Sequence, residues 1–135
     1  MRMHLDTDFL VYAISTAGPE RRLLLEIAES EAQVEMSAVA WYEFSRGPRT
    51  AEQLAVARSF FTEHGIIPFS EDLAMEAAEC FRQLGSPRRR AADIAIGVTA
   101  VAMKARLLTR NRRDFAGIGQ LQVVEAANGD AWPKE

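Results

Sequence analysis

The sequence has very little cysteine, lysine and histidine, and each shortage excludes a class of site. A single cysteine, Cys80, allows neither a disulfide framework nor a cysteine-based zinc site, and it fits a reducing, intracellular environment. Of the 16 basic residues only Lys104 and Lys134 are lysines, so nearly all the positive charge is guanidinium, which suits bidentate phosphate contacts. The two histidines, His4 and His64, leave few nitrogen ligands for a metal ion.

Long apolar runs and excess positive charge are also missing. No stretch approaches the roughly 20 apolar residues of a membrane helix, and the N-terminal segment has no signal-peptide cleavage pattern, so we expect no membrane association and a cytoplasmic protein. The net charge of −3 argues against binding nucleic acid by bulk charge alone, but allows local basic patches. A length of 135 residues with 48% hydrophobic content predicts one domain over residues 1–135.

Short apolar segments alternate with helical patterns along the chain. The start signals predict where the helices begin: N-caps at Thr7, Ser37 and Ser70, a first-turn proline at Pro19, and a capping box from Thr50 for a helix reaching about His64. The alternation predicts an α/β fold with three layers, α/β/α, around a mainly parallel five-stranded sheet. The expected strands are Met3–Asp6, Gln33–Met36, Ile66–Phe69, Arg106–Thr109 and Leu121–Val124.

Two aspartates flank the fourth of these strands. Asp93 opens an apolar helix kept slim by Gly97, and Asp114 follows the strand. Because the helix runs antiparallel to the strand after it, Asp93 is expected level with the carboxyl edge of the sheet, where open parallel sheets bind ligands. Each acid alone has an equally ordinary interpretation, as a favourable charge at a helix N-terminus or as a surface loop residue.

Two further acids are expected at the same edge: Asp6 ends the first strand and Glu43 lies on the helix that follows the second. Two carboxylates about 4 Å apart repel by roughly 1 kcal/mol in water and about 4 kcal/mol at an effective dielectric of 20, so four together require a cation. Hard oxygen ligands suit Mg²⁺ or Mn²⁺. Such an ion orients a phosphodiester and activates water, so the pattern favours metal-assisted phosphoester hydrolysis.

The segments around these acids resemble the PIN-domain ribonucleases, and among them the VapC-type toxins of bacterial toxin–antitoxin pairs. The resemblance runs nearly end to end in order and spacing, and the C-terminal segment IGQLQVVEAANGDAW is similar to the VapC/FitB branch. It implies a PIN-like fold and an Mg²⁺-dependent endoribonuclease, the toxin of a type II pair. The four segments are LDTD around Asp6, SAVAWYEFSRG around Glu43, AADIAIGVTA around Asp93 and LLTRNRRDF around Asp114.

The resemblance also implies roles and partners. Asp6, Asp93 and Asp114 would bind Mg²⁺, or Mn²⁺ in its place, with Glu43 reaching the ion directly or through water. Ser37 and Thr109 would be supporting hydroxyls. The expected partners are a transfer or ribosomal RNA substrate, a cognate antitoxin and a second copy of the chain. Two departures, Asp8 in place of a common Asn and Asn111 in place of an acid found in some members, lead us to expect one firmly held ion.

Two basic clusters flank the acids. They would clamp RNA phosphates beside the metal or receive an antitoxin side chain, and Asn111 can hold a water or phosphate by hydrogen bonds. The alternative is a solvated loop. We favour phosphate contact because both clusters flank the acids of an otherwise acidic chain. The residues concerned are Arg88, Arg89 and Arg90 before Asp93, and Arg110, Asn111, Arg112 and Arg113 before Asp114.

Two rival functions remain open. Asp6 and Asp8 in the segment DTD also resemble the nucleophile motif of haloacid-dehalogenase-type phosphatases, in which the first acid is phosphorylated and the second is the general acid. Those enzymes need a later lysine, and here the lysines lie at the far end of a helix and in the tail. The second rival is a non-catalytic binding module that keeps the fold; the presence of all four acids argues against it.

Overall fold

Five short parallel strands form the centre of the structure, a computed structural model that describes residues 1–130 and Trp132. The strand order is β3-β2-β1-β4-β5, and every neighbouring pair is parallel. The predicted mainly parallel five-stranded sheet is therefore confirmed. The strands are β1 (Arg2–Leu5), β2 (Gln33–Ser37), β3 (Ile66–Ile67), β4 (Arg106–Leu108) and β5 (Gln122–Val124).

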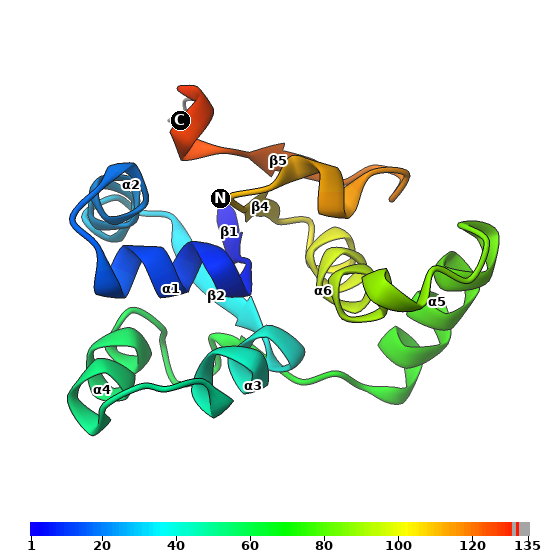
Figure 1. Ribbon diagram of the computed structural model, residues 1–135, viewed down its shortest axis with the longest axis horizontal. Helices are drawn as coiled ribbons and strands as arrows, with labels where there is room; N and C mark the ends of the chain where they lie inside the picture. The colour runs from blue at the N-terminus through cyan, green and yellow to red at the C-terminus, as the bar shows by residue number, and fades with distance from the viewer. Residues whose placement is uncertain (131, 133–135) are drawn as a thin grey trace.

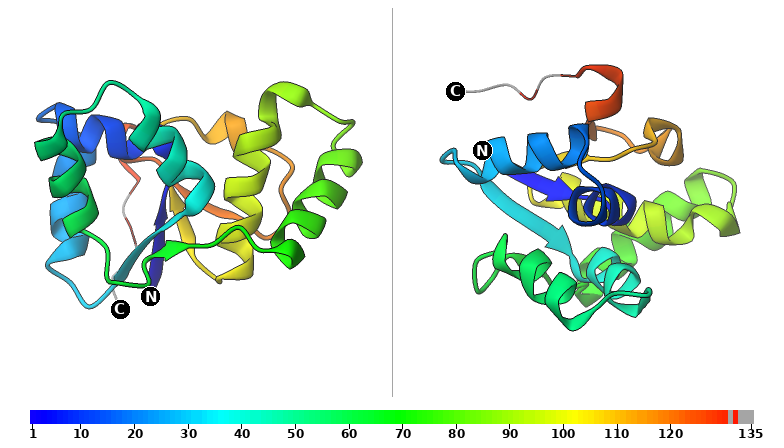
Figure 2. Two further views of the ribbon diagram at one scale, coloured as in Figure 1. Left: turned by 90° about the horizontal axis from the view of Figure 1, so that it is seen from below. Right: turned by 60° about the vertical axis from the view of Figure 1, so that its left-hand side comes forward.

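Helices cover both faces of this sheet, as the alternating pattern predicted. Helices α1, α2 and α4 lie to one side and α5 and α6 to the other, while α3 packs against both α1 and α6 (Figure 1 and Figure 2). None of the helices within residues 1–130 is long and apolar enough to cross a membrane. The helices are α1 (Thr7–Ser15), α2 (Pro19–Ala28), α3 (Ala38–Arg46), α4 (Ala51–Ser59), α5 (Glu71–Gln83) and α6 (Ala91–Ala102), with short 3₁₀ helices η1 (Arg88–Arg90), η2 (Arg112–Phe115) and η3 (Ala126–Asn128).

Most of the predicted helix starts are confirmed. The hydroxyls of Ser37 and Ser70 accept hydrogen bonds from the first turns of α3 and α5, and Thr50 forms the capping box with Gln53. The prediction for α1 is wrong, because Asp6 is the N-cap and accepts from the backbone N–H of Thr7. Asp6 therefore has two roles at once: it starts α1 and faces the edge where the acids gather.

Two boundaries in the middle of the chain also differ from the prediction. Helix α4 ends at Ser59 rather than near His64, because its last turn is closed by the backbone N–H of Phe60 and by Arg58, whose guanidinium donates to the carbonyls of Phe61 and Thr62. Strand β3 ends at Ile67 rather than Phe69. Residue 68 is a proline, which has no N–H to donate to the ladder.

Helix α6 is the most deeply buried helix of the described chain, with every residue from Ile94 to Ala100 buried. Its glycine permits a close approach from the segment that follows β4: a Cβ at Gly97 would lie 2.7 Å from Ile118 Cδ1 and 3.4 Å from Phe115 Cδ1. This packing brings η2, which contains Asp114, against the helix that contains Asp93 (Figure 1). The slim helix predicted from sequence thus sets the distance between two of the acids.

Candidate active site

Asp6 is the most buried acid of the site, with 5% of the residue exposed. One carboxylate oxygen accepts from the backbone N–H of Thr7 at 2.7 Å, and the other accepts from the hydroxyl of Thr109 at 2.8 Å. Loss of hydration on burial raises the pKa of Asp6 to about 7, although both hydrogen bonds favour the ionised form. The negative charges of Asp93 and Asp8 add to the rise. Asp6 is therefore held at a pKa where it exchanges its proton near neutral pH.

Asp93 lies in the first turn of α6 and is half-buried. Burial is the largest cause that raises its pKa, to about 6, and the charges of Asp114, Glu43 and Asp8 raise it further, while Arg90 opposes the rise. Because Asp93 also acts on Asp6, the structure links all four predicted catalytic acids electrostatically at one edge of the sheet.

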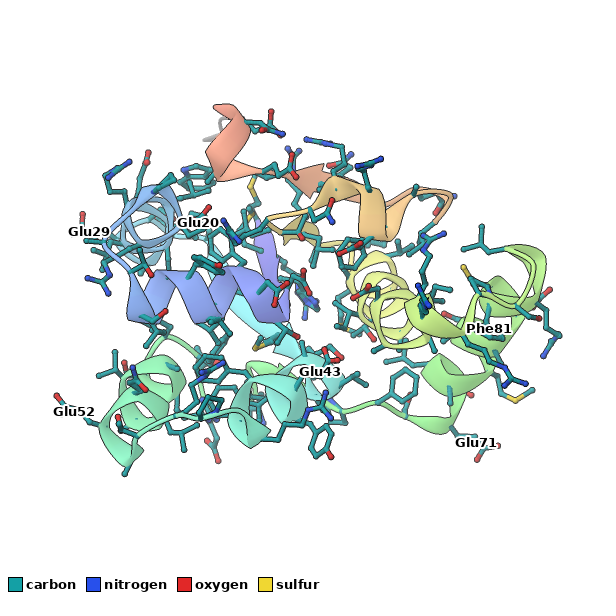
Figure 3. All side chains as sticks on the ribbon, viewed as in Figure 1. Glu20, Glu29, Glu43, Glu52, Glu71 and Phe81 are labelled. Carbon is teal, nitrogen blue, oxygen red and sulfur yellow. The ribbon has the colours of Figure 1, made fainter. Side chains whose placement is uncertain are left out.

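Glu43 reaches this edge from α3. Figure 3 shows it on the part of α3 that faces α6. Its carboxylate accepts a hydrogen bond of 2.8 Å from the hydroxyl of Thr7, the residue next to Asp6. The sequence predicts only a helix-capping role for Thr7 and does not reveal this contact. A hydroxyl directly after the first acid was the available signal, but the sequence does not show that α3 crosses the start of α1.

Of the two predicted supporting hydroxyls, that of Thr109 contacts an acid directly and that of Ser37 does not. Thr109 is buried, donates to Asp6 and accepts from the backbone N–H of Asn111 at 3.1 Å. Ser37 caps α3 through Val39 N at 3.1 Å, so it acts on Glu43 only by starting the helix that carries it. The side-chain amide of Asn111 donates to Asp114 at 3.2 Å and thereby orients the last acid.

Replacement of Thr109 by Val is expected to destabilise the protein by about 1–3 kcal/mol at pH 8, because a buried carboxylate oxygen of Asp6 and the N–H of Asn111 both lose their partner. Urea unfolding of the EDTA-treated protein measures the effect. Thr109→Ser keeps the hydroxyl and should lose clearly less. Equal losses for the two variants would show that the methyl group contributes as much as the hydroxyl and would contradict the assignment of the effect to the hydrogen bonds.

Three of the predicted phosphate-binding arginines have protein partners. Arg90 donates to the backbone carbonyl of Asp114 at 3.2 Å and to that of Ala116. The guanidinium of Arg110 lies 3.5 Å from the ring centroid of Tyr12 and 3.8 Å from the carboxylate of buried Glu20. Figure 3 shows Glu20 on α2. These contacts fix the chain around Asp114 to three neighbouring helices, α6, α1 and α2.

The third of these arginines, Arg112, fixes the same segment to the C-terminal part of the described chain. Its side chain donates to the carbonyl of Val123 at 3.3 Å and pairs with Asp130. The remaining arginines of the two clusters, Arg88, Arg89 and Arg113, are exposed, and their side chains have no hydrogen bond or ion pair with residues 1–130 or Trp132. They are the guanidinium groups most available to a phosphate.

The acids are chemically suited to a hard cation, but they do not form a ready coordination sphere. Within residues 1–130 and Trp132, no three His, Cys, Asp or Glu side chains are grouped closely enough to hold a metal ion. The pKa values of Asp6 and Asp93 are raised because burial and repulsion among the acids outweigh the two hydrogen bonds to Asp6 and the positive charge of Arg90 near Asp93. Such oxygen ligands suit Mg²⁺ or Mn²⁺.

The fold and the site together define a class: an open parallel α/β sheet with acids from four separate elements at its carboxyl edge. Within that class, the family model of the PIN domain matches residues 3–121. The chain belongs to the PIN domain family. A comparison with curated protein sequences gave no significant match.

Several solved structures share this fold over nearly their whole length. A toxin–antitoxin complex from Klebsiella pneumoniae has a chain 27% identical to this one, with 92% of this chain and 97% of that chain covered at a TM-score of 0.70. VapBC2 from Rickettsia felis, bound to a DNA fragment from its promoter, has 22% identity, coverages of 93% and 98%, and a TM-score of 0.72. FitAcB from Neisseria gonorrhoeae has 21% identity, coverages of 90% and 95%, and a TM-score of 0.66.

Proposed function

We propose that the protein is a metal-dependent endoribonuclease and the toxin of a type II toxin–antitoxin pair. The observation that carries the proposal is the convergence of Asp6, Glu43, Asp93 and Asp114 on one sheet edge, where burial and mutual repulsion raise the pKa of Asp6 to about 7 and that of Asp93 to about 6. The match to the PIN domain and the likeness to chains of solved toxin–antitoxin complexes support it.

In this proposal Asp6, Asp93 and Asp114 would hold Mg²⁺, which would supply charge neutralisation and an activated water. The hydroxyl of Thr109 and the N–H of Thr7 keep Asp6 oriented and favour its ionised form. Glu43, held by the Thr7 hydroxyl, accepts a proton from the attacking water.

The substrate is RNA, a transfer or ribosomal RNA by the family resemblance, bound in the cytoplasm. Exposed Arg88, Arg89 and Arg113 contact its phosphates, and their guanidinium groups can do so with paired hydrogen bonds. Because the chain as a whole has a net charge of −3, we expect binding to depend on these few local contacts. With about three phosphate contacts, the logarithm of the RNA binding constant should fall with the logarithm of the salt concentration with a slope of about −2.

Exposed apolar side chains offer surface for the proposed antitoxin and for a second copy of the chain. They lie on both sides of the sheet, on α1, α2, α3, α4, α5 and the segment before α5: Tyr12, Leu25, Tyr42, Val56, Phe69 and Met75. Light scattering of the purified chain, alone and with the protein encoded by the adjacent gene, measures both associations.

The deciding experiment is incubation of total cellular RNA with purified, antitoxin-free protein and Mg²⁺. We expect a few discrete fragments, which disappear when EDTA is added and return when Mg²⁺ or Mn²⁺ is restored. Mapping the fragment ends identifies the RNA and the cut position. Complete degradation that is insensitive to EDTA would point to a contaminating nuclease and contradict the proposal.

The same preparation separates the rival functions. Hydrolysis of para-nitrophenyl phosphate without RNA cleavage would favour the phosphatase that uses Asp6 and Asp8, although Lys104 lies beyond the C-terminal end of α6, away from the acids. Failure to hydrolyse either substrate, with retained RNA binding, would favour a non-catalytic module.

A further inference from the structure

Asp114 lies in a short segment whose own hydrogen bonds do not fix its position relative to α6. Helix η2 has four residues, and 3₁₀ helices of this length have strained hydrogen-bond geometry. It lies outside the sheet ladder, after β4 has ended at Leu108. The location of Asp114 relative to Asp93 therefore depends on what ties η2 to α6.

Two contacts hold η2 against α6. One is apolar: Phe115 is buried beside Gly97 of α6. The other is polar and comes from Arg90, the residue directly before α6, whose Nε donates to the carbonyl of Asp114 at 3.2 Å and whose second nitrogen donates to the carbonyl of Ala116. A single guanidinium thus spans three residues of the segment that carries the acid.

We propose that Arg90 is a positioning residue: its guanidinium fork holds the backbone of η2 so that Asp114 stays beside Asp93. The proposal rests on the function proposed above only where catalysis is measured; the backbone contact itself does not depend on it. Arg90 thus differs in role from Arg88 and Arg89, with which it forms an uninterrupted basic run.

The contrast with its neighbours supports this division of roles. Arg88, Arg89 and Arg90 lie on the same short helix, η1, and carry the same charge. Arg90 is partly buried and has two carbonyl partners, 24 and 26 positions further along the chain, whereas the other two are exposed. The backbone N–H of Arg90 is itself bound to the carbonyl of Pro87 at 2.8 Å, which fixes the base of the side chain.

Arginine is also the residue that this geometry requires. Its planar guanidinium presents donors in a rigid fork that can reach two carbonyls at once, whereas lysine offers a compact point charge on a flexible stem. Arg90→Lys therefore keeps the charge but not the paired contact. Arg89→Gln removes the same charge as Arg90→Gln from the adjacent position and serves as the matched control.

Amide hydrogen exchange of the EDTA-treated protein tests the contact without reference to activity. We expect exchange over residues 111–117 to be about tenfold faster in Arg90→Gln and Arg90→Lys than in the wild-type protein, and unchanged in Arg89→Gln. Exchange in the core strands should be the same in all four proteins, which controls for global destabilisation. Wild-type exchange rates over 111–117 in both Arg90 variants would overturn the proposal.

RNA cleavage then distinguishes positioning from phosphate binding. Misplacement of a reacting group by about 1 Å can cost about 100-fold in rate, so both Arg90 variants are expected to lower kcat about 10- to 100-fold with little change in KM. Arg89→Gln should instead raise KM. It should also reduce the slope of the RNA binding constant against salt concentration, on logarithmic scales, by about the contribution of one phosphate contact. Arg90→Gln behaving like Arg89→Gln in cleavage would overturn the proposal. If neither the wild-type protein nor any variant cleaves RNA, the proposed nuclease function fails, while hydrogen exchange still decides the role of Arg90.

Discussion

Asp6→Asn is expected to make the metal-free protein more stable at pH 8, by about 2–4 kcal/mol. The pKa of Asp6 rises from 3.8 to about 7 on folding, and each pKa unit corresponds to about 1.4 kcal/mol. Asn avoids the cost of burying a charge and remains a good N-cap for α1. Its oxygen can accept from Thr7 N–H while its amide donates to the Thr109 hydroxyl.

The pH dependence distinguishes this effect from a general gain in packing. Because folding raises the pKa of Asp6, its carboxyl contributes stability below about pH 4, and that contribution is lost as pH rises toward 7. The difference between Asp6→Asn and wild-type protein should therefore be near zero at pH 4 and grow to its full value by pH 8. Urea unfolding in EDTA across this range measures it. A difference that is constant with pH would contradict the pKa assignment.

Asp93→Asn is expected to lower kcat for RNA cleavage by at least about 100-fold, because it removes one of the three proposed ligands of the ion that would stabilise the developing charge, and loss of one stabilising group of this kind usually costs about 100-fold or more. Asp93 is the acid on which the charges of Asp114, Glu43 and Asp8 all act, so its removal affects the centre of the cluster. RNA binding should not weaken, because one negative charge that repels the phosphates is removed. Single-turnover cleavage and a filter-binding assay measure the two effects separately.

Asp72→Asn is the matched control for this variant. Asp72 is an exposed aspartate in the first turn of α5, as Asp93 is in the first turn of α6, so the two substitutions make the same change in helix-end electrostatics. Asp72→Asn should leave cleavage unchanged. A similar loss of kcat in both variants would mean that the effect of Asp93→Asn comes from the helix terminus and not from the acidic site.

The sequence was sufficient to predict the sheet and the edge of it at which the acids gather, because both follow from local patterns. Short apolar runs that alternate with capped helices define parallel strands, and residues directly after such strands gather at the carboxyl edge. Asp6 and Asp114 follow strands, and Asp93 starts the helix that returns to one. Their electrostatic coupling in the structure follows from that order.

The sequence was not sufficient for contacts between elements far apart in the chain. Thr7 was assigned to capping because its hydroxyl precedes a helix, and only the crossing of α3 over α1 shows that it binds Glu43 instead. For the two arginine clusters, phosphate contact was favoured over an antitoxin contact or a solvated loop, because charge and position do not reveal whether a guanidinium already has a carbonyl partner, as Arg90 has. The differences of one or two residues at strand ends arise from hydrogen bonding that patterns do not resolve.

The strand order has a consequence for when the acidic edge can exist during synthesis. Central strand β1 is made first, but one of its two neighbours, β4, comes from the last third of the chain, and the bond between Asp6 and Thr109 joins residues 103 positions apart. Until β4 emerges and docks, that side of β1 is an open edge, and the first acid lacks its hydroxyl donor, Thr109, and the last acid of the cluster, Asp114. Growing chains on the ribosome therefore contain Asp6 for most of translation without assembling the acidic edge, so the RNA cleavage proposed above must wait until synthesis is almost complete.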